Sequence, residues 1–87
     1  MKLELKDGRA ATLQSVRGEF VEVRSEASSP PGSTLELRSP DGPSPFLMKV
    51  RSCRREEAGG RFMIEGRWVN LSRRQRQILV DAGLFMP

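Results

Sequence analysis

Apolar and polar residues alternate in short runs through most of the first 66 residues, and this period of two favours β-structure. The longest run covers residues 45–54, where one face of the predicted strand carries Phe46, Met48 and Val50. Short strands bury enough apolar surface only when several of them pack around a common core. The pattern therefore predicts a small, mostly β protein.

Turn-forming segments separate the predicted strands. Asp7-Gly8 is typical of a hairpin turn, and it lies between extended runs at residues 2–6 and 10–13. The remaining strands are predicted at residues 19–24, 33–39, 45–54 and 61–66. The segments between them are rich in turn residues: the Ser- and Pro-rich loop 25–32, the turn Pro40-Asp41-Gly42-Pro43 and the polar turn 56–60.

The period of the apolar residues changes near the end of the chain. Ser72 followed by Gln75 has the spacing of a capping box, in which each residue satisfies a backbone amide of the first helical turn. Ile78, Leu79 and Ala82 then recur at helical spacing, and Gly83 is a typical helix stop. We therefore expect one helix over about residues 72–83.

These elements predict a single domain spanning residues 1–87. Its fold class is mostly β: a six-stranded antiparallel barrel, with strands over about residues 2–66, followed by one C-terminal helix. A barrel protects its strand edges by closing on itself, and the helix is expected to cover one opening. A chain of 87 residues is long enough for one such core.

Charge and residue usage limit the function. The net charge is +4, and residues 49–76 contain nine basic and three acidic residues, which favours an anionic partner. The chain has no His, and its single cysteine, Cys53, excludes an internal disulfide and a cysteine-based metal cluster. We expect no enzyme activity, no metal site and no cofactor. The chain shows neither a membrane-spanning run nor a signal-peptide core, so we expect a cytoplasmic protein that does not insert into membranes.

The segment Leu13-Gln14-Ser15-Val16-Arg17-Gly18 joins two predicted strands, and Pro31-Gly32 precedes a third. Because of these segments, the chain resembles a PilZ domain, the bacterial receptor module for cyclic di-GMP. The order of the strands, the segments 60–64 and 68–71 and the terminal helix add to the resemblance. Ser15 and Gly18 match the family's Asp/Asn-x-Ser-x-x-Gly motif. The resemblance implies a PilZ-type barrel with a ligand-binding turn at these positions.

The chain departs from the PilZ pattern where the family contacts its ligand. Leu13 replaces the acidic or amide residue of the motif, and the family's Arg-x-x-x-Arg arm has no counterpart. Lys2 and Lys6 have the spacing of the arm, but lysine cannot form the two parallel bonds of an arginine fork. Losing two charge-assisted contacts costs about 3–6 kcal/mol. We therefore expect cyclic di-GMP to bind weakly at best.

The first functional hypothesis is a PilZ-like signalling adaptor, for example in bacterial motility, that binds a protein partner. Its candidate surface comprises Arg67, Trp68, Arg73 and Arg74, with Trp68 alternatively a core residue. The second is a cyclic di-GMP receptor with an altered site at Arg9, Ser15, Arg17 and Gly18; alternatively, Ser15 and Gly18 serve only the turn. The third is a small basic barrel that binds nucleic acid. The oligomeric state is left open.

Overall fold

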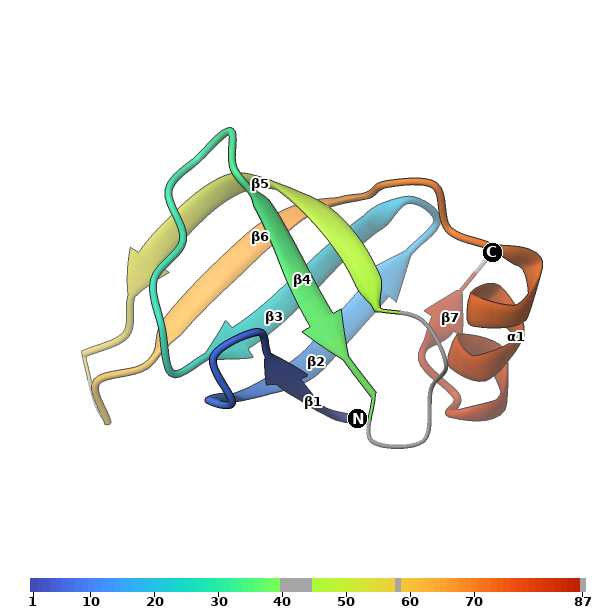
Figure 1. Cartoon of the computed structure of the whole chain (residues 1–87), viewed down its shortest axis with the longest axis horizontal. Helices are drawn as coiled ribbons and strands as arrows, with labels where there is room; N and C mark the ends of the chain where they lie inside the picture. Colours follow the sequence, from blue (N-terminus) through green and yellow to red (C-terminus); the bar gives the residue numbers. More distant parts are fainter. Residues whose placement is uncertain (40–44, 58, 87) are drawn as a thin grey trace.

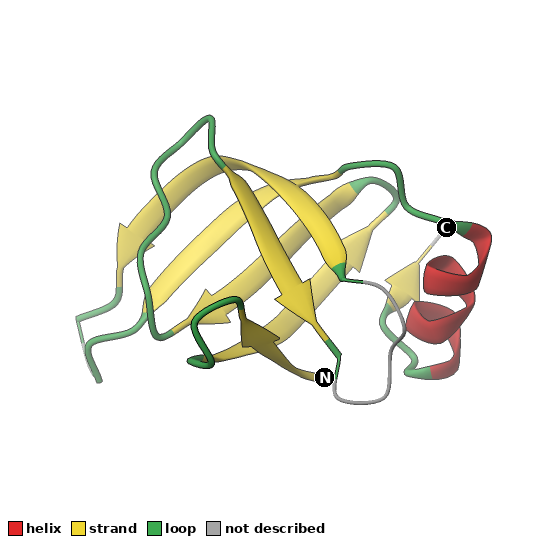
Figure 2. Cartoon of the chain, viewed as in Figure 1, coloured by secondary structure: helices red, strands yellow, loops and turns green. Residues whose placement is uncertain are grey.

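The computed structural model describes residues 1–39, 45–57 and 59–86. For Phe85 and Met86 it describes the backbone alone. The predicted strands and helix are all present (Figure 2). In chain order the elements are β1 (Lys2–Leu5), β2 (Ala10–Arg17), β3 (Phe20–Ser25), β4 (Thr34–Arg38), β5 (Phe46–Arg55), β6 (Phe62–Trp68), α1 (Arg73–Asp81) and β7 (Phe85–Met86). The turn predicted at residues 40–43 lies outside the described residues.

The first six strands form a closed antiparallel barrel (Figure 1). Their order around the barrel is β1-β4-β5-β6-β3-β2, and pairing of β1 with β2 closes the ring. The seam between β1 and β4 is narrow, with only two residue pairs in register. The two-residue β7 adds in parallel to the end of β2, a strand that the sequence pattern did not predict. The mostly β fold with one C-terminal helix is confirmed.

Inward-facing apolar residues fill the barrel, as the alternation predicts. Phe46, Met48 and Val50 of β5 are all buried, with exposed Lys49 between them. The other buried apolar side chains are Leu3, Leu5, Ala11, Leu13, Val16, Val21, Val23, Leu37, Ile64, Trp68 and Leu79. Cys53 is half-buried and packs against this core.

Two β-bulges interrupt the alternation. Leu13 pairs with Val23 and Ser15 with Glu22, so Gln14 is an extra residue in β2. Arg51 is likewise an extra residue in β5, between Val50 and the next paired residue. A bulge lets two successive side chains point to the same face of a sheet. After the bulge at Gln14 the facing of β2 shifts by one residue, so Val16 is buried although strict alternation from Leu13 would place it outside.

Helix α1 begins and ends as the sequence predicts. The Ser72 hydroxyl accepts a hydrogen bond from the Gln75 amide, and the Gln75 side chain accepts one from the Ser72 amide, both at 3.0 Å. Gly83 has a φ of 74°, and Leu84 donates its amide proton to the Leu79 carbonyl, which completes a Schellman motif. Leu79 is fully buried and anchors the helix to the core.

The molecule is longer than it is wide, with extents of 34 × 23 × 22 Å. Helix α1 lies at one end and the β5–β6 hairpin extends at the other (Figure 1). Arg54 and Arg55 belong to this hairpin as the last residues of β5, which ends one residue beyond the predicted strand. Among the described residues, no helix is both long and apolar enough to cross a lipid bilayer.

Candidate functional site

Ser15 lies inside strand β2 and not in the predicted turn. The bulge at Gln14 extends β2 to Arg17, and the turn to β3 contains only Gly18 and Glu19. Gly18 has a φ of 57°, a conformation that glycine adopts at little cost, which confirms its role in the turn. The Ser15 hydroxyl bonds across the strands to Glu22 at 3.0 Å, and not to a turn amide.

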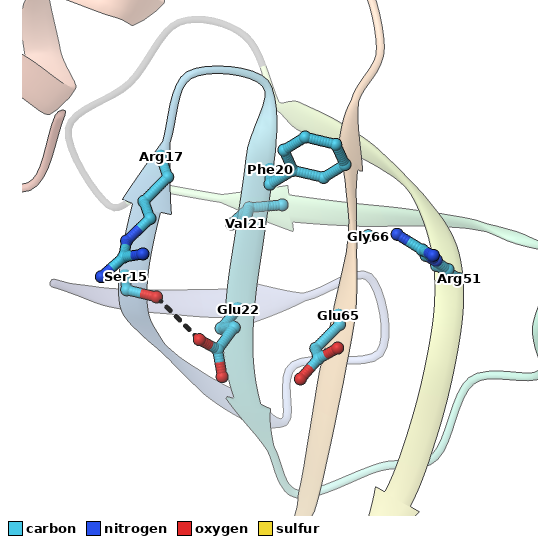
Figure 3. A pocket seen from close by; sticks show the side chains of 8 residues that line it. All are labelled: Ser15, Arg17, Phe20, Val21, Glu22, Arg51, Glu65 and Gly66. Atoms are coloured by element: carbon cyan, nitrogen blue, oxygen red, sulfur yellow. Dashed lines mark hydrogen bonds between the residues drawn. The ribbon is translucent and has the colours of Figure 1, made fainter. Parts of the chain in front are cut away.

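Ser15 lines a depression of about 240 Å³ on the outside of the barrel (Figure 3). We call it the outer depression, and it crosses the four neighbouring strands β2, β3, β6 and β5. Its lining residues are Ser15, Arg17, Phe20, Val21, Glu22, Arg51, Glu65 and Gly66. Two residues predicted for ligand binding, Ser15 and Arg17, are thus brought together.

Two carboxylates line the outer depression from its two middle strands, β3 and β6. Glu22 and Glu65 are directly paired across β3 and β6, and both are half-buried. Ser15 donates a hydrogen bond to Glu22, and Ser52 donates one to Glu65 at 3.4 Å. Neither glutamate forms an ion pair within the described part of the chain. Like charges directly opposite each other in a sheet repel, so this arrangement favours a positively charged group between or above them.

Arginine side chains flank the carboxylates on both sides. Arg17 comes from β2 and Arg51, the extra residue of the second bulge, from β5 (Figure 3). Phe20 is 52% exposed at the end of the depression near the β2–β3 turn. The Arg67 guanidinium lies 5.8 Å from the centre of its ring and pairs with Glu19 at 2.5 Å. These contacts hold an apolar ring at the surface beside the acidic pair.

Arg9, the other residue predicted for ligand binding, lies elsewhere. It follows the β1–β2 turn, at the end of β2 opposite to Arg17, and lines a separate groove. Its side chain is held by Asp7 through contacts of 2.7 and 2.8 Å. The side-chain hydrogen bond from Arg9 lowers the pKa of Asp7, and the same bond raises the pKa of Arg9. Arg9 therefore cannot contact a ligand in the outer depression without leaving this pair.

The predicted partner-binding residues are split between the core and the surface. Trp68 is only 8% exposed and packs on Phe46 with ring centres 5.5 Å apart, which favours the alternative of a core residue. Its indole Nε1 is buried and has no hydrogen-bond partner among the residues that the structure describes. Arg67 lies beside the outer depression, whereas Arg73 and Arg74 are exposed in the first turn of α1. The side chains of Phe85 and Met86 lie outside the part of the chain that the structure describes.

Sequence reasoning missed Glu22, Glu65 and Arg51 as site residues. The alternation places both glutamates on the outer face, but their pairing depends on β3 lying beside β6 rather than β4. That neighbour relation joins strands about 40 residues apart and leaves no local signal. Arg51 is the extra residue of the bulge opposite Gly66. A glycine inside a strand often marks a bulge, so Gly66 was the one sequence signal for this position.

Changing Glu65 to glutamine should stabilise the fold slightly. The substitution removes one of two opposed charges and keeps an oxygen that can accept the bond from Ser52. We expect the free energy of unfolding to rise by about 0.2–1 kcal/mol in urea titrations. Glu57→Gln is the matched control, because Glu57 is exposed in a turn and should change little. A destabilised Glu65→Gln variant would contradict the proposed repulsion.

The described residues contain no group of three or more His, Cys, Asp or Glu side chains able to hold a metal ion. No protein-family model, curated protein or solved structure matches the chain. The structure shows a six-stranded antiparallel barrel with a C-terminal helix. Since nothing matches, membership of the PilZ family stays a hypothesis.

Proposed function

We propose that the protein is a PilZ-like binding module that recognises a partner protein through the outer depression and catalyses no reaction itself. The observation that carries this proposal is the exposed Phe20 ring beside the acidic pair of Glu22 and Glu65. Aromatic side chains, phenylalanine included, are enriched at protein interfaces, where a polar rim surrounds them. A basic side chain of the partner would lie over the two carboxylates.

The acidic pair is half-buried, and this increases its value for recognition. A charge that is partly removed from water interacts more strongly with an incoming opposite charge than a fully exposed one does. The serine hydroxyls at Ser15 and Ser52 orient the two carboxylates without neutralising them. A lysine or arginine of the partner would form the ion pair that neither carboxylate forms with a described residue, and Phe20 would contact its aliphatic stem.

Cyclic di-GMP is the second candidate, because the same depression carries arginines on both flanks. Arg17 and Arg51 could contact phosphates, Phe20 could stack on a base, and a carboxylate could accept from a guanine edge. Against it, Leu13 is buried in the core and leaves no polar group on the outer face at the motif position. Two carboxylates near the phosphates would also oppose a dianionic ligand.

A peptide-display selection against the immobilised protein tests the main proposal. We expect the selected peptides to carry a lysine or arginine next to an apolar residue. The double variant Glu22→Gln with Glu65→Gln should weaken their binding at least about tenfold, because it removes both charges of the site. Phe20→Ser should have a similar effect through the lost apolar contact.

A matched variant and a second ligand separate the two candidates. Arg17→Ala with Arg51→Ala should leave basic peptides bound, but it should abolish any heat signal from cyclic di-GMP in calorimetry. Arg73→Glu with Arg74→Glu tests the helix surface and should leave peptide binding unchanged. The main proposal is rejected if the selected peptides bind the double glutamine variant as tightly as the unmodified protein. Tight binding of cyclic di-GMP by the unmodified protein would also reject it.

A further inference from the structure

Strand β5 is longer than the strand that pairs with one of its edges. β6 pairs with β5 as far as Arg55, but β4 pairs only with residues 46–49. The loop before β4 extends this contact to Val50, which exchanges hydrogen bonds of 2.8 Å with Gly32 and Ser33. Beyond Val50, no described strand lies along this edge, which we call the β5 edge (residues 51–55; Figure 1).

The directions of the backbone groups follow from the neighbouring hydrogen bonds. The amide of Glu56 donates to the Arg61 carbonyl, so residue 56 points toward the β6 side of the hairpin. Successive residues of a strand point their amide and carbonyl groups to opposite sides. Cys53 and Arg55 therefore direct their N–H and C=O groups away from β6. These are the groups that an added strand would bond.

The side chains along the β5 edge are strongly basic. Arg51, Arg54 and Arg55 are exposed, and none of them forms an ion pair with another described residue. The nearby Glu56 is already bound to Arg24 at 2.7 Å. From its first to its last arginine the edge spans about 13 Å at the usual rise of a strand, which a short extended peptide can follow.

We infer that the β5 edge binds an extended acidic segment of a partner protein by strand addition. Main-chain bonds to Cys53 and Arg55 would provide the pairing, and Asp or Glu side chains of the segment would contact the three arginines. A second copy of this chain is the less favourable occupant, because pairing along the same edges would bring the two sets of arginines together. Arg51 also lines the outer depression, but strand addition along the β5 edge does not depend on the function proposed for that depression.

The test uses the whole protein and two capped peptides of about seven residues, a usual strand length. In one, glutamate alternates with valine and threonine; in the other, lysine replaces glutamate. We expect the glutamate peptide to shift the NMR signals of residues 52–55 and to slow amide exchange at Cys53 and Arg55. The lysine peptide should do neither. Arg51→Glu with Arg54→Glu should weaken the glutamate peptide at least about tenfold.

A proline variant separates strand addition from simple charge attraction. Arg55→Pro removes the N–H that faces the open edge, whereas Arg55→Ala removes only the side chain. We expect the proline variant to bind the glutamate peptide about twofold to tenfold more weakly than the alanine variant. Because the Arg55 N–H faces away from β6, both variants should keep the barrel's amide protection.

Three results would overturn the inference. The first is the absence of any shift at residues 52–55 with either peptide at millimolar concentration, which would mean that the arginines keep the edge closed. The second is equal binding by the proline and alanine variants, which would leave only electrostatic attraction. The third is protection of Cys53 and Arg55 that rises with protein concentration and without peptide, which would identify a second copy as the occupant.

Discussion

Replacing Gly66 with alanine is expected to destabilise the barrel by about 3 kcal/mol and to lower its melting temperature by about 12–24 °C. A Cβ at this position would lie 2.2 Å from the Lys49 carbonyl oxygen and 2.8 Å from the Met48 methyl group. The methyl group can move, but the carbonyl belongs to the paired strand β5. The two strands would have to separate where the Arg51 bulge forms.

A turn glycine provides the control for this prediction. At Gly59 an added Cβ would meet nothing within 4 Å, although its φ of 84° strains any other residue. Gly59→Ala should therefore cost only about 1 kcal/mol, and thermal unfolding followed by circular dichroism separates the two variants. Gly66 is not among the glycines with positive φ, so only close packing of β6 on β5 distinguishes it, and equal losses would contradict the expected clash with the Lys49 carbonyl.

The fold could be predicted from the sequence because its core obeys local rules. Alternation in β5 places Phe46 and Met48 inward, and the capping pair Ser72 and Gln75 marks the start of α1. These signals act within a few residues of each other, so they remain visible in a linear sequence. β7 could not be predicted, since two residues carry no period and the strand depends on the nearby end of β2.

The candidate site could be predicted only in part, because it depends on register between distant strands. Ser15 and Arg17 drew attention through a motif in one strand, whereas Glu65 reaches the same place from β6. Each bulge shifts the facing of the residues that follow it, so strict alternation misplaces outward side chains there. Trp68 shows a different ambiguity: the sequence left it either a core residue or a partner contact, because a large aromatic residue between two elements is typical of both, and the structure buries it.

Replacing Leu79 with alanine is expected to cost about 2–5 kcal/mol, because its side chain is fully buried and joins α1 to the barrel core. The next residue, Val80, is 47% exposed on the same helix, so Val80→Ala is a matched control that should change stability by about 0.5 kcal/mol or less. Urea unfolding measures both losses, and amide exchange locates them. Since α1 is also held by the bond from the Gln75 side chain to the Pro45 carbonyl at 2.8 Å, we expect the helix and barrel to unfold together. Loss of protection in α1 alone, with the barrel amides unchanged, would instead show that the helix is a separately folding cover.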